Sequence, residues 1–458
     1  MLQQTPASSR IETTPVPDSL AEPSSLGPTG PDELRPTNIR WGVFSFLFVL
    51  MFVLYLDRLC IGIVAPAMQR DLNLTDAQMG NVFAAFLVAY GLFEVVTGHW
   101  GDRVGTRAVL TRIVIWWSVF TALTGMARSY LFLFLTRFLF GAGEAGALPN
   151  VARVTATWFP QSSQGWVRGA VHMPALLGGM VAPPATAYLI GYVSWRGAFI
   201  IYGLLGLIWA ASFYLWFRNH PREHRSVNAA EVELIGEPPP NAHGSIPWKA
   251  IVENRNVWLL GTVLVAGSCT VYTLLSWYPS YLVNVRGETE ITAGWLSAVV
   301  MLGGVIGCLV GGWTADKAQI LLPHSRWSRS AVGGLGFSLA AVSMVAGANA
   351  PSTLWMSVWF AIACAGIHLH AAAWWGVAAD IGGGNVGSLF AMINSIGALG
   401  AAVALKGFGE IDRAYWGATF GWCGLILALG AACWLCVDNR IKLVVAAAEE
   451  CSPDGSPA

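Results

Sequence analysis

The sequence has few charged residues. Only 11% of its 458 residues are Asp, Glu, Lys or Arg, whereas an ordinary soluble domain has about 25%. Hydrophobic residues make up 55% of the chain. This composition excludes an ordinary soluble globular protein, because too few polar side chains remain to cover its surface. It predicts an all-α polytopic membrane protein with the lipid bilayer as a partner.

The sequence also lacks a charge excess and a cysteine framework. The formal net charge is zero, so nothing favours binding to nucleic acid. The eight cysteines show no regular spacing, and the pair Cys433 and Cys436 lies inside a hydrophobic segment. We therefore expect neither disulfides nor a metal site. No phosphate loop or nucleophile with a base is found, so we expect no cofactor and no enzymatic activity.

Long hydrophobic segments begin only after a polar tail. Residues 1–36 are rich in Pro, Ser, Thr and Gly, which predicts a disordered tail. They contain no basic run followed by a short apolar core, so we expect no cleaved signal peptide. Hydropathy then predicts twelve transmembrane helices, over residues 41–64, 78–98, 108–127, 130–152, 169–190, 197–217, 257–283, 291–312, 330–348, 353–379, 387–408 and 416–437.

Lys and Arg residues lie mostly on one side of these predicted spans. This bias predicts that both termini are cytoplasmic, in a multi-pass protein of the inner (plasma) membrane. The longest polar break lies in the middle of the chain and divides the spans into two sets of six. The predicted domains are a disordered tail (1–40), a six-helix half (41–217), a cytoplasmic central loop (218–256), a second six-helix half (257–437) and a cytoplasmic tail (438–458).

A short repeat relates the two halves. The segment GHWGDRVGTR at Gly98–Arg107 is echoed by GWTADK at Gly312–Lys317, at an offset of 214 residues. Two six-helix halves that repeat the loop after their second span are typical of secondary transporters, whose binding site lies at the midplane between the halves. The matched residues are Gly98, Asp102 and Arg103 in the first half and Gly312, Asp316 and Lys317 in the second.

Four charged residues lie deep in predicted spans, where charges are costly and rare. Arg137 and Glu144 are in the stretch RFLFGAGEAG, and Asp57 and Arg58 are in VLYLDRLCIGIV. Arg137 and Glu144 are seven residues apart, so they share a helix face about 10 Å apart along the axis. By depth, we expect Asp57 to pair with Arg137, and Arg58 to lie unpaired above Glu144. Such an arrangement suits an anion and a proton.

Four motifs together resemble the anion:cation symporter family of the major facilitator superfamily. They are the loop motif at Gly98–Arg107, YLDR at Tyr55–Arg58, RFLFGAGEAGALPN at Arg137–Asn150 and RNHPREHRSVNAAEVELI at Arg218–Ile235. The resemblance covers about residues 40–440. It implies a monomeric, proton-coupled importer of an organic anion, with a sugar acid such as a hexuronate or aldonate as substrate, working by alternating access.

The resemblance also assigns residues to roles. It implies proton coupling at Asp57, Glu144 and Arg137, and binding of the substrate carboxylate by Arg58. An arginine suits that task because its forked guanidinium stays charged. Further substrate contacts are implied at Tyr90, Trp374, Trp375 and Asn394, and a conformational clamp at Asp102, Arg103, Arg107 and Asp316.

Two features depart from the family's pattern. Sugar-acid carriers commonly have a glutamine in the fifth span, and residues 166–190 contain none. A flatter or more apolar carboxylate, such as an aromatic or dicarboxylic acid, is therefore an alternative substrate. Glu94 stands where a neutral polar residue is expected, and we interpret it as a surface or loop-clamp charge. Three histidines in or near the spans, His172, His368 and His370, have no assigned role.

Other classes of function remain open. A proton-coupled drug exporter would have a glycine-proline motif in the fifth span, and Gly179–Pro184 matches it only in part. A membrane receptor or membrane enzyme is disfavoured, because the four buried charges are all present and no catalytic group accompanies them.

Overall fold

The structure consists of helices, as the composition predicts. It is a computed structural model that describes residues 35–98, 105–237, 248–322, 325, 327–382, 386–438 and 440. Within these residues there is no β-strand. Lipid offers no partners for backbone polar groups, so a spanning chain must satisfy them within its own helices. The predicted all-α class is confirmed.

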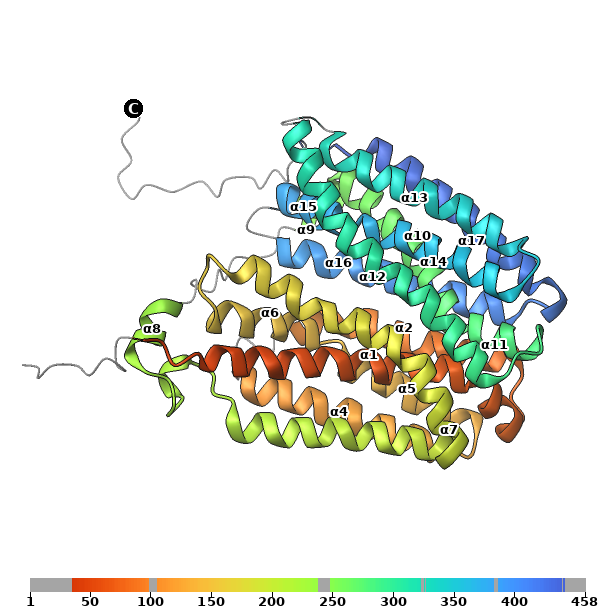
Figure 1. The fold of residues 1–458 in the computed structure, drawn as a ribbon, viewed down its shortest axis with the longest axis horizontal. Helices are drawn as coiled ribbons and strands as arrows, with labels where there is room; N and C mark the ends of the chain where they lie inside the picture. Colours follow the sequence, from red (N-terminus) through yellow and green to blue (C-terminus); the bar gives the residue numbers. More distant parts are fainter. Residues whose placement is uncertain are drawn as a thin grey trace, which may run out of the picture.

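The helices from α1 to α7 form one helical bundle, which we call the first half. Its longest helix, α7, is interrupted at Ser194, which has a left-handed φ of 61° with ψ of 169°. The chain reverses there, so the two arms of α7 correspond to the predicted fifth and sixth spans (Figure 1). The helices of this half are α1 (Ile39–Leu72), α2 (Asp76–Gly98), α4 (Thr106–Gly125), α5 (Tyr130–Glu144), α6 (Ala147–Trp158) and α7 (Gln164–Trp216).

The second half forms a similar bundle beside it (Figure 1). Two of its predicted spans are each made of two helices in sequence, α10 with α11 and α14 with α15. The elements of this half are α10 (Arg255–Ser276), α11 (Tyr278–Asn284), α12 (Glu290–Leu321), α13 (Trp327–Ala348), α14 (Thr353–Leu369), α15 (Ala371–Gly382), α16 (Val386–Gly409), η3 (Arg413–Tyr415) and α17 (Trp416–Cys436).

Ten helical stretches of the described residues are long and apolar enough to cross a membrane. Among these ten stretches, the whole of α7 is a single stretch, and α2 is not one of them. The predicted number of twelve spans requires both arms of α7 and α2 to cross, and it stays a prediction.

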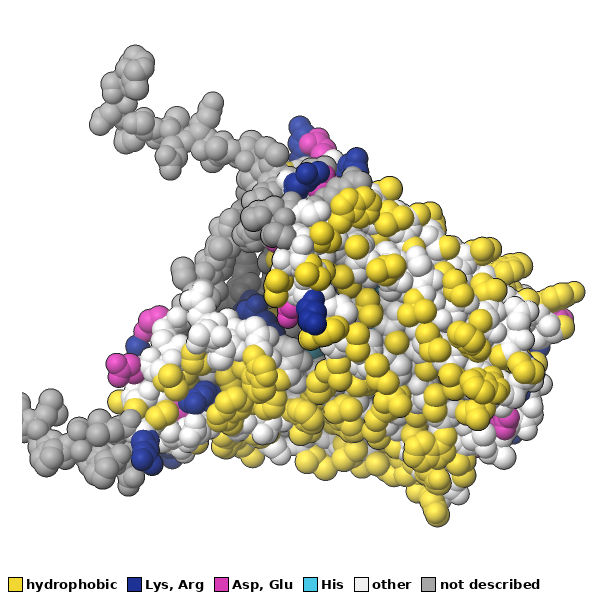
Figure 2. All heavy atoms as spheres, turned by 45° about the horizontal axis from the view of Figure 1, so that its top comes forward, with side chains coloured by type: hydrophobic (Ala, Val, Ile, Leu, Met, Phe, Trp, Pro, Cys, Tyr) yellow, Lys and Arg dark blue, Asp and Glu magenta, His cyan; other side chains and the backbone are white. Residues whose placement is uncertain are grey.

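The sides of the molecule are apolar. Figure 2 shows hydrophobic side chains over the flank of the second half, with Lys, Arg, Asp and Glu gathered toward the ends. Many large apolar side chains on these flanks, such as Leu335, Val342 and Val403, are exposed. So large an apolar surface is stable only against lipid. The protein is a multi-pass membrane protein.

A short central segment joins the halves and includes η1 (Pro221–Glu223), α8 (Ala229–Ile235) and α9 (Trp248–Glu253). Glu231 of α8 is fully buried against the start of α1. Its carboxylate accepts hydrogen bonds from the backbone amides of Ile39, at 3.0 Å, and Arg40, at 3.1 Å. Free amides at a helix N-terminus attract a carboxylate. The central segment is thereby fixed to the end of the molecule where α1 begins, which we call the central-segment end.

The two halves are joined at the opposite end, which we call the far end. Arg413 of η3 donates two hydrogen bonds, of 2.7 and 2.8 Å, to the carboxylate of Asp76 at the start of α2. Arg70 of α1 pairs with Glu290 of α12 at 2.6 Å. At the central-segment end, by contrast, Figure 2 shows the surface hollowed between the halves. Among the described residues, the halves are joined at the far end, and the surface is hollowed between them at the other.

Candidate functional site

A cavity of about 270 Å³ lies between the halves. Ligand pockets commonly range from about 300 to 1,000 Å³, so this one suits a small molecule. It is lined from the first half by Tyr55, Arg58, Leu59, Tyr90, Leu148, His172 and Leu176, and from the second by Leu264, Gly267, Ser268, Val271, Tyr272, Leu275, Ile367, His368, His370, Ala371, Trp374, Trp375, Phe390, Asn394 and Ala398.

The structure brings all five predicted substrate residues to this cavity. Arg58 and Tyr90 line it from α1 and α2, and Trp374, Trp375 and Asn394 line it from α15 and α16. The ring of Trp375 stacks on that of Phe390 at 4.1 Å, so the second half contributes an aromatic wall. Whether these residues bind a substrate stays a prediction.

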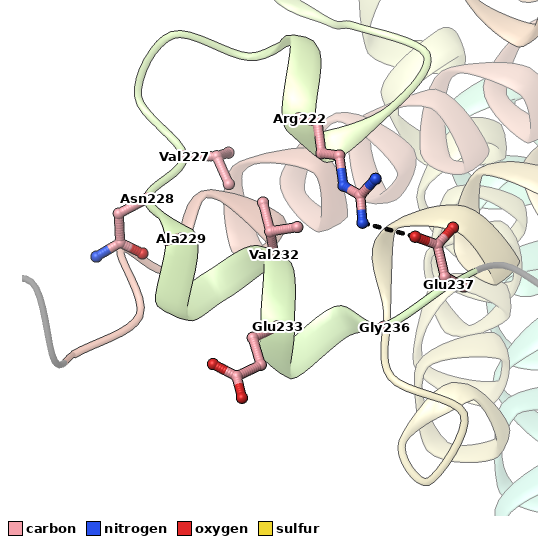
Figure 3. Close-up of a pocket in the computed structure, with 8 residues that line it drawn as sticks. All are labelled: Arg222, Val227, Asn228, Ala229, Val232, Glu233, Gly236 and Glu237. Atoms are coloured by element: carbon pink, nitrogen blue, oxygen red, sulfur yellow. Dashed lines mark hydrogen bonds and ion pairs between the residues drawn. The ribbon is translucent and has the colours of Figure 1, made fainter. Parts of the chain in front are cut away.

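A second recess lies on the surface beside α8 and has a different character. Its volume is about 530 Å³. Figure 3 shows Arg222 turned toward Glu237, and their side chains pair at 2.6 Å while both remain largely exposed to solvent. An exposed pair of this kind contributes little binding energy. We therefore place the candidate site in the cavity between the halves.

Two breaks in helices border the cavity. The predicted fourth span is divided after Glu144, where α5 ends, and α6 begins at Ala147. The predicted tenth span is divided at His370, between α14 and α15. Ala145, Gly146 and His370 keep right-handed helical backbone angles, so each span continues through its interruption as one membrane-crossing stretch. The sequence-based segments 130–152 and 353–379 did not show either break.

Arg58 is paired with Glu144 rather than unpaired. Its Nε donates to Glu144 Oε1 at 2.8 Å, and its Nη2 donates to the same oxygen. Its Nη1 donates to the hydroxyl of Tyr272 at 3.2 Å. The expectation that Arg58 lies unpaired was wrong, because its long side chain reaches across to the fourth span.

Aromatic rings surround the Arg58 guanidinium. Its Cζ lies 5.1 Å from the ring centre of Tyr55, 5.2 Å from that of Phe86 and 4.9 Å from that of Tyr90. Cation–π contacts of this length stabilise a buried guanidinium. They also leave its hydrogen-bond donors free for carboxylates. Arg58 is thereby held in a fixed position at the first-half wall of the cavity.

Asp57 and Arg137 do not form the predicted direct ion pair. Both are buried, at 0% and 1% exposure. Neither carboxylate oxygen of Asp57 has a hydrogen-bond partner of standard geometry among the described residues. The charges of Arg137 and Glu144 nevertheless act on it, and the indole of Trp117 lies nearby. The Arg137 guanidinium lies 4.2 Å from the ring centre of Phe140.

Tyr272 was missed by the sequence analysis. It lies on α10 and contacts Arg58 of α1, so it joins the two halves. It follows Arg58 by 214 residues, the offset of the repeated loop. Residues related by that offset occupy equivalent places in the two halves. Applying the offset to Arg58 would have identified Tyr272.

Glu94 is buried, at 2% exposure, and is not a surface charge. Its two carboxylate oxygens accept hydrogen bonds from Nδ2 of Asn394 at 2.8 and 2.7 Å. This contact joins α2 of the first half to α16 of the second. The interpretation of Glu94 as a surface or loop-clamp charge was wrong, because hydropathy cannot show which helix faces it.

The three histidines all line the cavity. His368 Nδ1 donates to the backbone carbonyl of Cys364 at 2.9 Å. His370 Nδ1 bonds to the backbone of Ile367, and its ring packs edge-on against Phe337. A second nitrogen remains on the imidazoles of His368 and His370 for a ligand or a water.

The clamp residues are only partly described. Asp102 and Arg103 lie outside the described residues. Arg107 stays within the first half, where its Nε donates to the carbonyl of Tyr214 at 2.8 Å. Asp316 is exposed on α12 and has no ion pair within the part of the chain that the structure describes. The clamp stays a prediction.

Among the described residues, no group of three or more His, Cys, Asp or Glu side chains could hold a metal ion. What the cavity offers instead is a buried arginine with a carboxylate partner, flanked by tyrosines, tryptophans and an amide. Such a site can exchange an internal carboxylate for an external anion.

Comparison with known proteins agrees with this architecture. A model of the Major Facilitator Superfamily matches residues 47–405. The chain is 30% identical over 416 residues to the probable sulfoacetate transporter SauU of Cupriavidus necator, with 88% of this chain and 95% of that protein covered. It is 28% identical over 384 residues to the hexuronate transporter of Bacillus subtilis, with 80% and 87% covered.

The fold is similar to that of a solved transporter. A bacterial homolog of the human lysosomal transporter Spinster, crystallised in an inward-facing and unoccupied conformation, superposes with a TM-score of 0.74 at 19% identity. The match covers 89% of this chain and 98% of that one. Because the family model matches most of the sequence, the chain belongs to the Major Facilitator Superfamily.

Proposed function

We propose that this protein is a secondary active transporter that takes up a small organic anion together with protons. Membership of the superfamily and relatives named as transporters of sulfoacetate and hexuronate support a carrier rather than an enzyme. The substrate would carry a carboxylate or sulfonate group. A sugar acid such as a hexuronate or aldonate is the first candidate, and an aromatic or dicarboxylic acid is the alternative.

The cavity supports an anion of modest size. Arg58 supplies the positive charge, and Tyr90 and Tyr272 lie beside it. Trp374 and Trp375 form an apolar wall on the other side. A molecule with an acid group at one end and a flat or ring-shaped body would satisfy both surfaces.

The pairing of Arg58 with Glu144 is the observation that carries the proposal. Two nitrogens of the guanidinium are already engaged by one carboxylate oxygen. A substrate anion can use the same fork only if Glu144 releases it. Protonation removes the charge of Glu144 and its attraction to Arg58, so a bound proton favours a bound anion. Competition for Arg58 would thus couple the transport of the proton to the transport of the anion.

Asp57 and Arg137 are two further buried charged side chains in the first half. An ionised carboxylate without hydrogen-bond donors is costly in a low dielectric. We therefore expect Asp57 to carry a proton in this conformation and to lose it when Arg137 moves closer.

We assign the central-segment end to the cytoplasm. The central segment, which the Lys and Arg bias predicts to be cytoplasmic, lies at that end. The protein would then be inward-open, in the inner membrane, with both termini inside. In this conformation the far-end ion pairs close the outer side. Alternating access would break them while a clamp containing Asp102, Arg103, Arg107 and Asp316 closes the inner side.

The direct test is uptake into proteoliposomes. The purified protein would be offered labelled carboxylates and sulfonates, including a hexuronate, an aldonate, sulfoacetate, a dicarboxylate and an aromatic acid, with and without an imposed pH gradient. We expect accumulation of at least one anion only when the outside is more acidic. Equal accumulation with and without the pH gradient would contradict proton coupling. Efflux of a drug cation would favour an exporter.

A further inference from the structure

A buried carboxylate stands beside the cavity and has no part in the coupling scheme above. Glu94 lies on α2, one turn after Tyr90, and both side chains face the second half. Tyr90 lines the cavity, with its ring 4.9 Å from the Arg58 guanidinium carbon. The charge of Arg58 acts on Glu94, and the Tyr90 hydroxyl lies within reach of it. Glu94 therefore belongs to the surroundings of the candidate site.

The Glu94 carboxylate determines how Asn394 is oriented. Both of its oxygens accept from Nδ2 of Asn394, at 2.8 and 2.7 Å. An ionised carboxylate can only accept hydrogen bonds, so it can contact an asparagine only through the NH₂ group of the amide. A neutral partner such as glutamine could contact either end of the amide. In the structure both Glu94 oxygens contact the NH₂ group of Asn394, so an ionised Glu94 favours the orientation that leaves Oδ1 for the cavity.

The fixed orientation leaves an acceptor for a ligand. Asn394 lines the cavity. Its Oδ1 receives no hydrogen bond from the described residues, and it is not among the polar atoms that the protein encloses. The first-half wall presents the donors of Arg58 and the hydroxyl of Tyr90. An anion that spans the cavity would therefore meet donors at its acid group and an acceptor at Asn394.

We propose that Glu94 is a specificity-determining positioning residue. It holds the Asn394 carbonyl oxygen toward the cavity and so selects anions that carry a hydrogen-bond donor, such as a hydroxyl, near the acid group. This inference rests on the proposed function, because it concerns which organic anions the site prefers. A contact that only joined α2 to α16 would affect all anions equally.

The test compares acids that differ by one hydroxyl. Binding to the purified full-length protein would be measured calorimetrically for lactate and propionate, and for isethionate and ethanesulfonate. One hydrogen bond to a buried polar group changes affinity by about five- to tenfold. We expect the wild-type protein to prefer the hydroxylated member of each pair by that factor. Glu94→Gln lets the amide take either orientation and should lower the preference at least twofold, by weakening the hydroxylated anion alone.

Two further variants separate positioning from structural support. Glu94→Asp keeps the charge and should retain most of the preference. Asn394→Ala removes the acceptor and should lose the preference even if Glu94→Gln does not fold. Because Glu94 acts through Asn394, the variant with both Glu94→Gln and Asn394→Ala should lose no more of the preference for hydroxylated anions than Asn394→Ala alone.

Each outcome has a distinct meaning. An undiminished preference in Glu94→Gln, or an equal loss of affinity for both members of a pair, overturns the inference and leaves the proposed function standing. A wild-type protein that binds both members of each pair equally also overturns it. A wild-type protein that binds and transports no organic acid or sulfonate overturns the proposed function, and the inference with it.

Discussion

At the scale of single residues, the Arg58 and Glu144 pair is incomplete. Two nitrogens of Arg58 bind Glu144 Oε1, while Oε2 is buried and has no hydrogen-bond partner among the described residues. A buried carboxylate with hydrogen bonds to only one of its oxygens stabilises a fold poorly, because the second oxygen has lost its water without gaining a partner. This favours a pair that opens during transport.

Arg58→Lys tests whether the forked guanidinium holds the substrate. Lysine keeps the charge but loses the bidentate geometry, so substrate affinity should fall by about 1 to 3 kcal/mol, or roughly ten- to a hundredfold. Thermal stability should change little. Both quantities can be measured on the same purified variant. A purely structural Arg58 would behave in the opposite way, with lower stability and normal affinity.

Glu144→Gln tests the coupling role. Glutamine imitates the protonated acid and cannot ionise, so Arg58 stays available to the anion. We expect exchange of internal for external substrate to continue while accumulation disappears. A gradient of one pH unit supplies about 1.4 kcal/mol per proton, enough for about tenfold accumulation in the wild type. Glu233→Gln, the same change at an exposed position of α8, is the matched control. Undiminished uphill uptake by Glu144→Gln would remove Glu144 from coupling.

The sequence identified the charged residues that are buried inside the first half but not how they pair. Burial cost alone singles out Asp57, Arg58, Arg137 and Glu144, because charges inside apolar helices are rare. Helical spacing gives their depth in the membrane. It does not give the reach of an arginine side chain, which is why the pairing of Arg58 with Glu144 was missed.

At the scale of helices, hydropathy located the helical segments well but missed their interruptions. The predicted fourth span, 130–152, is divided between α5 and α6. Both parts remain apolar, so a hydropathy window cannot detect the break. Ser194 separates the arms of α7 with one left-handed residue, where the sequence suggested a short loop. Local backbone angles of this kind depend on tertiary packing rather than on composition.

The far-end ion pair between η3 and α2 yields a prediction at this scale. The bidentate contact of Arg413 with Asp76 joins the halves in the present conformation. A partly exposed pair contributes about 0.2 to 1 kcal/mol. Asp76→Asn should therefore raise the ratio of outward-open to inward-open molecules by up to about fivefold. Distances between spin labels at Arg128 and Glu410 would report the change.

The control lies at the same end of the molecule. Asp71 pairs with Arg196, but both belong to the first half, so this contact does not join the halves. Asp71→Asn should leave the distance distribution unchanged. An equal response to both substitutions would mean that the far end responds to lost charge in general and not to a lost connection between halves.

At the scale of the whole molecule, the 214-residue repeat predicted two related halves, and the structure has two bundles that meet at a cavity. The direction in which that cavity opens could not be predicted. A transporter must populate inward-open and outward-open states that differ by only a few kcal/mol, so one sequence encodes both. Residues that join the halves in one state separate in the other, and sequence patterns cannot show which state prevails.

The central claim is that a substrate anion and the Glu144 carboxylate compete for Arg58. Its most direct test is the pH dependence of substrate affinity, measured on purified wild-type protein and on Glu144→Gln with the best-transported anion. At low pH Glu144 is protonated, Arg58 is available and binding is tight. As pH rises, the ionised Glu144 recovers Arg58 and binding weakens, by up to tenfold per pH unit for one linked proton. We predict this decline in the wild type and a nearly flat profile in Glu144→Gln. An equal decline in both proteins would contradict the competition.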